Sequence, residues 1–367
     1  MFEIEDSYSP SARIKVVGVG GAGGNAVDHM IDAGIQGVEF IAVNTDLQAL
    51  SKKKAPVKIQ IGAEATGGKG AGADPEKGRV AALESRAALE EALRGADMVF
   101  IAAGMGKGTG TGAAPVVAEI CRNLGILTLP VVTRPFNMEG EHRGRVAKQG
   151  LEEMERMVET VLVIPNDRIL QLAGRVPLSR AYAMADDTLR HAVQSIAEVI
   201  QCEGQVNCDF NDVRAIMGRQ GGIYMGVGAA SGEGYAPRAM QQALTNPYLE
   251  NVAVQGATGM LINVSCRDEE AFTAEDLQSI LKVAKGVLDK DANFIYGLVF
   301  NPAQAEEARV TVIATGFRGA EPAHAADTAA LAAESARQAR SLFRGEALPT
   351  AEDLDIPTFM RRKLVAA

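Results

Sequence analysis

The segment 104–112 constrains this chain most, because every second residue in it is glycine (Gly104, Gly106, Gly108, Gly110 and Gly112). It follows the predicted buried strand 97–103 and precedes residues 114–124, which have the pattern of a helix. A second glycine stretch, 20–24, stands between the β-branched run 14–19 and a helix predicted over 25–33. Glycine tolerates positive φ and lets a backbone approach a ligand closely. Strand, glycine turn and helix, twice over, predict an α/β fold whose loops face a ligand.

Other segments extend this alternation. Further buried strands are predicted at 38–43 and 126–133, with a glycine-rich loop at 67–74 and one long helix over 75–94. Buried strands interleaved with helices are typical of a parallel sheet covered on both faces.

A long helix over 179–200 follows, with Leu189, Val193, Ile196 and Ile200 on one apolar stripe. A second α/β region extends over 213–317, with strands expected at 259–264, 293–300 and 309–315. We therefore predict a Rossmann-type parallel-sheet domain joined by a long central helix to a smaller α/β domain.

Composition excludes several classes of protein. The chain has 37 Lys+Arg and 46 Asp+Glu among 367 residues, a formal charge of −9, which disfavours sequence-independent nucleic-acid binding. No apolar run approaches the ~20 residues of a membrane span, and the acidic N-terminus is unlike a signal peptide. The four cysteines are widely spaced, with no zinc-ligand pattern, so free thiols in a reducing compartment are expected. We expect a cytoplasmic protein with no metal held by its own side chains.

Both glycine loops are predicted to lie at the carboxyl edge of one parallel sheet, where such sheets bind ligands. The helix that follows each loop adds the positive end of its dipole, so a ligand with two or three phosphates is indicated. Gly18, Gly20 and Gly23 also fit a dinucleotide fingerprint, with Asp46 as a ribose contact. That alternative, a nicotinamide-dependent oxidoreductase, does not account for the second loop. A Walker A loop is excluded, because Gly108 stands after Lys107 where Ser or Thr belongs.

The sequence resembles the FtsZ family of tubulin-like proteins. Residues 106–112 (Gly-Lys-Gly-Thr-Gly-Thr-Gly) resemble the family signature Gly-Gly-Gly-Thr-Gly-Thr-Gly, and so do the flanking 97–105 and 113–117. Further similar segments are 19–26, 43–46, 135–137, 164–167, 310–317 and the terminal 355–359. The resemblance implies a GTPase that binds GTP or GDP with Mg²⁺, K⁺ being a further candidate ion, and that polymerises head to tail into filaments for cell division.

The resemblance also assigns candidate residues around the nucleotide. Phosphates are expected at Gly20, Gly21, Ala22, Gly23, Gly24, Gly104, Gly106, Lys107, Gly108, Thr109, Gly110, Thr111 and Gly112, with Ala71 and Gly72 sensing the γ-phosphate. Asn44 is a further expected nucleotide-binding residue. Glu139 and Arg143 are placed by the ribose and phosphates, and Asn25 and Asn166 near the sugar and base. Tyr182 stacks on guanine, and Asp186 accepts from its N1–H and N2–H. A helix-start aromatic beside a solvated carboxylate is the structural alternative for the last two.

The segment 204–212 resembles the family's catalytic loop, with Asn207, Asp209 and Asp212 in the matching positions. A surface turn with an Asp cap is the other interpretation. The helix between Tyr182 and this loop spans about 30 Å at ~1.5 Å per residue. Carboxylates beyond its far end therefore cannot reach the nucleotide read at its start, and they are expected to act on the GTP of a neighbouring subunit, in a heterologous contact that builds a filament.

Departures from the family pattern leave a second function open. Lys107 replaces a glycine, which costs about 1–2 kcal/mol if its φ is positive and adds a cation near the phosphates. Gln205 and Cys208 alter the catalytic loop, so a paralogue that polymerises with slow or no hydrolysis is the alternative. The terminal peptide carries Ile356, Pro357, Phe359, Arg361 and Arg362, expected to bind membrane-anchoring and regulatory division proteins at midcell.

The predicted organisation has seven parts. They are a flexible N-terminus (1–12), the GTP-binding domain (13–178), the central helix (179–202), the catalytic loop (203–212), the C-terminal α/β domain (213–317), a linker (318–350) and the partner-binding peptide (351–367).

Overall fold

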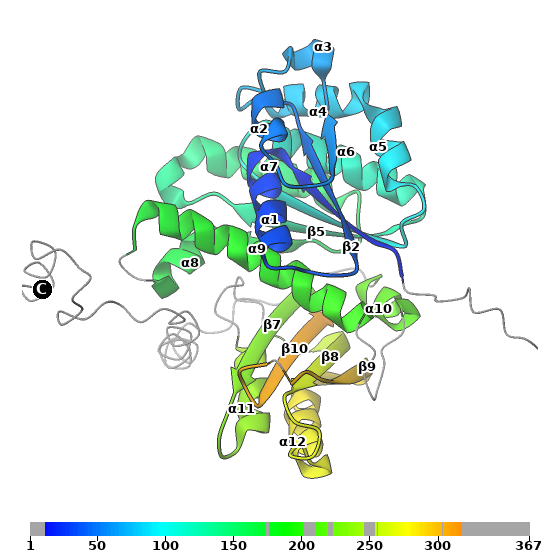
Figure 1. The fold of residues 1–367 in the computed structure, drawn as a ribbon, viewed down its shortest axis with the longest axis vertical. Coiled ribbons are helices and arrows are strands. Elements are labelled where there is room, and N and C mark those ends of the chain that lie inside the picture. The colour runs from blue at the N-terminus through cyan, green and yellow to red at the C-terminus, as the bar shows by residue number, and fades with distance from the viewer. Residues whose placement is uncertain are drawn as a thin grey trace, which may run out of the picture.

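A computed structural model describes residues 12–173, 176–201, 210–218, 223–245, 254, 256–302 and 304–316. Two sheets, one above the other, are separated by a long helix (Figure 1). The upper sheet has six parallel strands in the order β3-β2-β1-β4-β5-β6. Its strands are β1 (Ile14–Val19), β2 (Val38–Asn44), β3 (Val57–Gln60), β4 (Met98–Gly104), β5 (Leu127–Arg134) and β6 (Leu162–Pro165). This is the doubly wound order, which confirms the predicted fold class.

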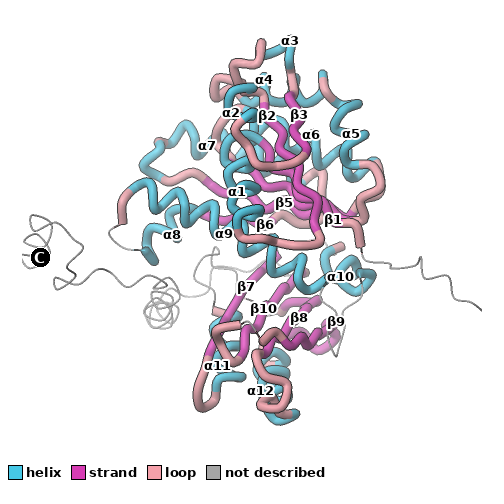
Figure 2. Tube along the Cα trace, viewed as in Figure 1, coloured by secondary structure: helices cyan, strands magenta, loops and turns pink. Residues whose placement is uncertain are grey.

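Helices cover both faces of this sheet (Figure 2). They are α1 (Gly20–Asp32), α2 (Leu47–Ser51), α3 (Ala63–Thr66), α4 (Pro75–Glu84), α5 (Arg86–Leu93), α6 (Thr109–Asn123), the 3-10 turn η1 (Asn137–Glu139), α7 (Glu141–Glu155) and α8 (Asn166–Ala173). Alternate residues of each strand enter different cores. Val16 and Phe100 belong to a core with α1, whereas Val17 and Ile101 belong to a core with α4, α5, α6 and α7. Burial on both faces explains why these strands are uniformly apolar in sequence.

The long helix α9 (Leu178–Gln201) joins the two sheets. Its predicted stripe is confirmed, because Leu189, Val193 and Ile196 are fully buried. They belong to one hydrophobic core that includes α1 and the upper sheet on one side and the lower sheet on the other. Since this core is continuous, α9 fixes the positions of the two sheets relative to each other.

The lower sheet has four strands in the order β7-β10-β8-β9, with β10 antiparallel to both neighbours and β8 parallel to β9. Its elements are α10 (Phe210–Met217), β7 (Ile223–Ala230), α11 (Tyr235–Leu244), β8 (Ala257–Cys266), α12 (Ala274–Lys285), β9 (Leu288–Phe300) and β10 (Ala308–Thr315). Two threonine hydroxyls hold the end of α10. Thr315 donates to the Ile216 carbonyl (2.8 Å) and Thr160 to the Met217 carbonyl (3.5 Å), so both domains anchor this helix.

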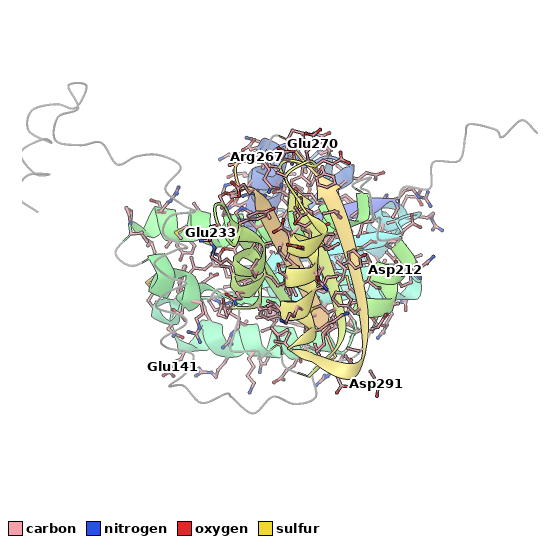
Figure 3. The ribbon with its side chains drawn as sticks, turned by 90° about the horizontal axis from the view of Figure 1, so that it is seen from below. Glu141, Asp212, Glu233, Arg267, Glu270 and Asp291 are labelled. Carbon is pink, nitrogen blue, oxygen red and sulfur yellow. The ribbon has the colours of Figure 1, made fainter. Side chains whose placement is uncertain are left out.

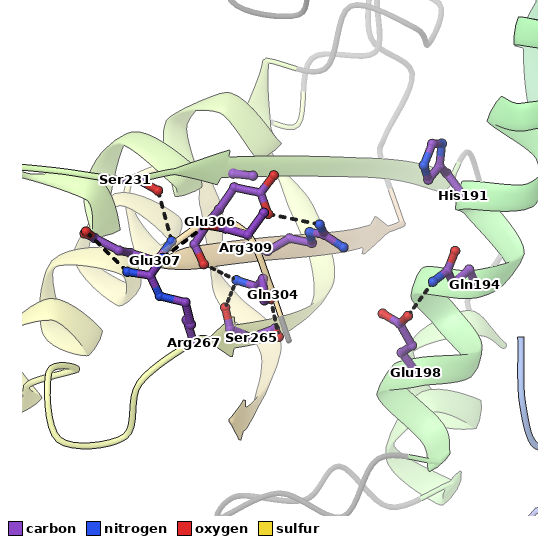
Figure 4. A network of polar contacts seen from close by, with 12 residues as sticks. His191, Gln194, Glu198, Ser231, Ser265, Arg267, Gln304, Glu306, Glu307 and Arg309 are labelled. Carbon is purple, nitrogen blue, oxygen red and sulfur yellow. Dashed lines mark hydrogen bonds and ion pairs between the residues drawn. The ribbon is translucent and has the colours of Figure 1, made fainter. Parts of the chain in front are cut away.

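A polar network lies at the start of β10 and extends to β8 (Figure 4). Arg309 donates to Glu306 (3.1 Å), and Ser265 shares a hydrogen bond with Gln304 (2.7 Å). Figure 4 also shows His191, Gln194 and Glu198 on α9, where Gln194 Nε2 donates to Glu198 Oε1 (2.7 Å). This lower side of α9 is therefore polar where it does not enter the core.

Several local expectations were wrong. The helix predicted over 75–94 is broken at Ser85, whose φ and ψ of −100° and 19° are not helical and whose hydroxyl accepts from Gly62 N (3.1 Å). The glycine turn 20–24 and the end of the loop 104–112 are instead the first turns of α1 and α6. Strand β7 was not predicted, because Gly226 and Gly228 lower strand propensity. Both positions need glycine, since a Cβ there would lie 1.8 Å from the Ala243 carbonyl oxygen and 2.0 Å from that of Ala239.

None of the helices in the described ranges is long and apolar enough to cross a membrane.

Candidate functional site

The candidate site lies where the order of the upper sheet reverses, between the adjacent strands β1 and β4. A helix follows each of these strands: α1 begins directly after β1, and α6 begins after a short loop that follows β4. No described side chain caps the N-terminus of either helix. The first N–H groups of a helix have no intrahelical partner, and their dipole favours an anion. Two such N-termini side by side therefore suit a ligand with more than one phosphate.

The two glycine loops touch each other at this point. Gly20 has a φ of 75°, and a Cβ on it would lie 3.0 Å from Gly110 N. The loop 104–112 is held in shape by threonines, because Thr111 Oγ1 accepts from Gly106 N (2.9 Å) and Thr109 Oγ1 bonds Thr45 Oγ1 (2.7 Å). The structure thus brings the predicted segments 20–24 and 104–112 together into one backbone cradle.

The loop 70–74 closes one side of this cradle. A Cβ on Gly108 would lie 2.8 Å from Ala71 Cβ and 3.0 Å from Asp74 N. Gly72 has a φ of 61°, with no described atom within 4 Å of where its Cβ would be. Its neighbour Ala73 also has a positive φ, 62°, in a conformation that is uncommon for a residue with a side chain. The predicted γ-phosphate loop therefore lies against the second glycine loop.

Lys107 is exposed and has no positive φ. The strain that a positive φ would cause therefore does not arise. Lys107 directly precedes Gly108, the N-cap of α6, so it adds a cation next to the N-terminus of that helix.

A group of aromatic and charged side chains belongs to the segment 135–143 and to α9, and the segment 135–143 contacts Gly106 of the cradle. The Tyr182 ring packs edge-on against buried Phe136, with 5.2 Å between centroids and 82° between planes, and Tyr182 is 39% exposed. Glu139 forms an ion pair with Arg143 and accepts from Phe136 N (3.1 Å). Burial, with the Glu139 charge close by, raises the pKa of Tyr182. The structure thus brings Tyr182, Glu139 and Arg143 close together.

Two asparagines lie at the ends of strands along the same edge. Asn44 ends β2, is 5% exposed, and its Oδ1 accepts from Asp46 N (3.3 Å). Asn166 follows β6 and is also 5% exposed, but its Oδ1 has no hydrogen-bond partner among the described residues. A buried polar atom without a partner is costly. Asn166 therefore has an acceptor that a bound ligand can satisfy.

Asp186 lies one helical turn after Tyr182, on the same face of α9. Burial raises the pKa of its carboxyl from 3.8 to about 6, and the charges of His29 on α1 and Lys53 oppose this rise. Lys53 also contacts Asn25, so Asn25 and Asp186 share one basic neighbour. The sequence reasoning missed Lys53, because no motif distinguishes it from the adjacent Lys52 and Lys54.

The predicted catalytic residues are not part of this cluster. Asp212 is in the first turn of α10, beyond the far end of α9, and lies toward the edge of the molecule seen from below (Figure 3). Asp186 and Gln201 are 15 residues apart on one helix, which corresponds to about 22 Å. Asn207 and Asp209 lie outside the described residues.

Comparisons with known proteins agree with this arrangement. Residues 13–174 match the GTPase domain of the tubulin/FtsZ family, and residues 221–318 match the C-terminal domain of the FtsZ family. The empty FtsZ dimer of M. jannaschii is 41% identical, with a TM-score of 0.78 over 83% of this chain and 88% of that one. CetZ2 of Haloferax volcanii, in a GTPγS-bound protofilament, is 20% identical, with a TM-score of 0.71 over 89% and 99%. CetZ1 of the same organism, a GDP-bound monomer, is 19% identical, with a TM-score of 0.70 over 89% and 99%. The CetZ matches show the shared fold.

The doubly wound sheet, its paired helix N-termini and the central helix define a nucleotide-binding protein of the tubulin type. Within that class, the two matched domains and the 41% identity show that the chain belongs to the FtsZ family. That family consists of cytoskeletal GTPases, so guanine nucleotide is the ligand that the site implies.

Proposed function

We propose that this protein is a GTPase that assembles head to tail in the presence of GTP, and that each subunit completes the active site of its neighbour. One observation carries the proposal: the phosphate cradle and Asp186 lie toward one end of α9, while Asp212 lies beyond the other end. A single chain cannot bring both to one nucleotide, since about 22 Å of helix separates Asp186 from the end of α9. A stacked neighbour can.

Guanine is selected at the α1–α9 contact. Ionised Asp186 accepts from guanine N1–H and N2–H, a pair of donors that adenine does not present, and Tyr182 provides a half-exposed aromatic surface for the base. Asn166 Oδ1 gains the partner that it lacks among the described residues when the nucleotide binds. These side chains supply specificity, and the backbone cradle supplies the phosphate affinity.

The cradle holds the phosphates through N–H groups at the N-termini of α1 and α6, with Lys107 at its rim and Gly72 close to the γ-phosphate. The described residues contain no group of three or more His, Cys, Asp or Glu arranged to hold a metal ion. Mg²⁺ fits this site as an ion carried mainly by phosphate and water oxygens, which is its usual coordination. When bound, it neutralises charge that develops on the phosphates. K⁺ is a further candidate ion in the same proposal.

Hydrolysis requires a positioned water and a group to accept its proton. Asp209 and Asp212 of the upper subunit orient that water toward the γ-phosphorus, with Asn207 beside them. The O–P bond to the water forms as the bond to the β-phosphate bridging oxygen breaks, and the products are GDP and inorganic phosphate. The N–H cradle stabilises the negative charge that develops. Because α10 is anchored by Thr160 and Thr315, Asp212 is held on a fixed element.

Assembly follows from the same geometry. A contact that joins the top of one subunit to the bottom of the next uses two different surfaces and repeats without closing, which makes a filament. The related FtsZ of M. jannaschii forms a dimer, and CetZ2 forms a protofilament with GTPγS, which supports a self-associating role. We further propose that the filament belongs to the cytoplasmic cell-division ring at midcell. In this proposal the terminal peptide (Ile356, Pro357, Phe359, Arg361 and Arg362) binds its membrane-anchoring partners.

A slowly hydrolysing or non-hydrolysing filament is the second candidate. Lys107 favours it, since an exposed cation at the cradle stabilises bound phosphates in GTP and GDP alike and so slows exchange. Both candidates predict assembly with GTP, and they differ in phosphate release.

The test combines sedimentation and phosphate release in one tube, with GTP, GDP or no nucleotide. Asp212→Ala should bind GTP normally and release no phosphate, whereas the exposed neighbour Asn211→Ala should behave as the parent. Turnover of Asp212→Ala at the parental rate would remove the proposed catalytic role. Assembly without phosphate release by the parent would favour the second candidate.

A further inference from the structure

The side chain of Lys53 lies against the base-recognition end of the site. Lys53 is in the short connection between α2 and β3, and its side chain is only 13% exposed. Its Nζ pairs with Asp28 Oδ2 on α1 at 3.1 Å, and the Asp28 side chain is 16% exposed. A Cβ on Gly24 would lie 3.1 Å from both Cδ and Cε of Lys53. The lysine stem therefore lies over the second turn of α1, where a glycine leaves room for it.

This position fixes the amide of Asn25. Lys53 Nζ is within hydrogen-bond distance of Asn25 Oδ1. An ammonium group only donates hydrogen bonds, so the amide atom that faces it must be the oxygen. Asn25 Nδ2 therefore points away from Lys53 and remains available as a donor. Asn25 is exposed at the start of α1, in the segment proposed to contact the sugar and base.

The same ammonium group lies close enough to Asp186 to favour its ionised form. The charged groups around Asp186 come from three segments. On α1 they are Asp28 and His29, on the α2–β3 connection Lys53, and on α9 Asp187, which is paired with Arg190. Lys54 is paired with Asp32, and Asp167 at the start of α8 accepts from Asn137 N. Lys53 and His29 are thus the cations that oppose the effect of burial on Asp186.

We propose that Lys53 is a positioning residue for guanine recognition: anchored by Asp28, it orients the Asn25 amide toward the nucleotide and supplies a cation to the base-recognition end of the site. This inference rests on the proposed guanine-binding role of the site and names the residue that prepares it. Without Lys53, the Asn25 amide can rotate and Asp186 loses one of the two cations that oppose the effect of burial. Both changes weaken guanine binding. The loss of the cation weakens it most strongly in acid, where Asp186 is more easily protonated.

Lys54 provides a matched control. It is the next residue, it also pairs with an aspartate of α1, and its Nζ lies 2.7 Å from Asp32 Oδ2. The Lys54 and Asp32 side chains are 52% and 54% exposed, one turn of α1 further from the glycine loop. Loss of its charge removes an ion pair to the same helix that is exposed, and an exposed pair is worth little to stability. A general effect of losing an α1 ion pair would therefore appear in both variants.

The experiment measures binding of a fluorescent GDP analogue between about pH 5 and 8 for the parent, Lys53→Met, Lys53→Arg and Lys54→Met. Lys53→Met should bind at least about threefold more weakly at pH 8, and its loss of affinity in acid should begin at a higher pH than in the parent. Lys53→Arg keeps the charge and the donors and should keep the parental acid midpoint. Lys54→Met should match the parent throughout. If Lys53→Met does not fold, Lys53→Gln replaces it.

Parental binding by Lys53→Met across the whole range, or equal losses in Lys53→Met and Lys54→Met, would overturn the inference. So would an acid midpoint in Lys53→Arg equal to that in Lys53→Met. A parent protein that binds no GDP at any pH would instead overturn the proposed function, so the two failures are distinguishable.

Discussion

Asp186 makes guanine nucleotide binding depend on pH in a defined way. Burial raises its pKa to about 6, and only the ionised carboxylate accepts both guanine donors. At pH 7 about nine-tenths of the molecules have the ionised form, and at pH 5 about one-tenth. Affinity should therefore fall about tenfold between pH 7 and pH 5 from this group alone. Since the donors of guanine favour the ionised form, binding near pH 6 should release protons.

The measurement is a titration with GDP at a series of pH values, compared with Asp186→Asn. The terminal phosphate of GDP also titrates near pH 6, so the relevant quantity is the difference between the two proteins. The ratio of their affinities should change about tenfold from pH 7 to pH 5, because the amide that replaces the carboxyl in the variant does not titrate. Parallel pH profiles for the two proteins would refute the role of Asp186.

Stability provides an independent check with the opposite sign. A carboxyl whose folded pKa lies above its usual 3.8 binds more protons when folded, so its contribution to stability falls as pH rises from about 4 to about 6. A shift of two units corresponds to about 3 kcal/mol. Relative to Asp186→Asn, the nucleotide-free parent should therefore lose stability over this range of pH, while its affinity for GDP rises.

Three further predictions concern other residues. Lys107→Gly should change the free energy of unfolding by no more than about 0.5 kcal/mol, since Lys107 is exposed and has no positive φ. The variant should nevertheless bind GDP more weakly at low salt, because it lacks a cation near the phosphates. Affinity for GDP equal to that of the parent at low salt would contradict this. Gly108→Ala should lose nucleotide binding, because its Cβ would lie 2.8 Å from Ala71 Cβ. The control Gly144→Ala has open space around its Cβ, so it should bind nucleotide normally, and its free energy of unfolding should rise by about 0.5–1 kcal/mol, because alanine is favoured over glycine inside helix α7. Calorimetry that showed the opposite effects would count against the cradle. Cys121 and Cys266 are buried, and burial raises the pKa of both thiols to about 12. In the variant Cys202→Ser/Cys208→Ser only these two thiols remain, so the variant should react with a thiol reagent only when it is unfolded. Rapid labelling of the folded variant would be evidence against this packing.

The sequence predicted those parts of the fold that local patterns determine. The apolar runs and glycine loops marked β1, β2, β4 and β5 of the upper sheet but not the short strands β3 and β6. The stripe through Leu189 and Val193 marked α9, because a buried helix face needs apolar residues at fixed spacing. Motif resemblance assigned Tyr182 and Glu139 to one nucleotide site, and the structure brings both side chains against Phe136, a contact that the sequence did not predict.

The rest depends on contacts between residues distant in sequence. The break at Ser85 reflects a hydrogen bond to Gly62, and β7 contains glycines because α11 packs against it closely. Lys53 lies beside Asn25 and Asp28 only because the chain returns from β2 alongside α1. No spacing rule in a single sequence indicates which of three consecutive lysines has that position.

The most direct test of the shared site is the dependence of phosphate release on protein concentration at saturating GTP. If the acidic residues of one molecule act on nucleotide held by another, the rate per molecule should be close to zero in dilute solution and rise steeply once subunits associate. A rate per molecule that stays constant on dilution to the point where sedimentation detects only monomers would contradict the account.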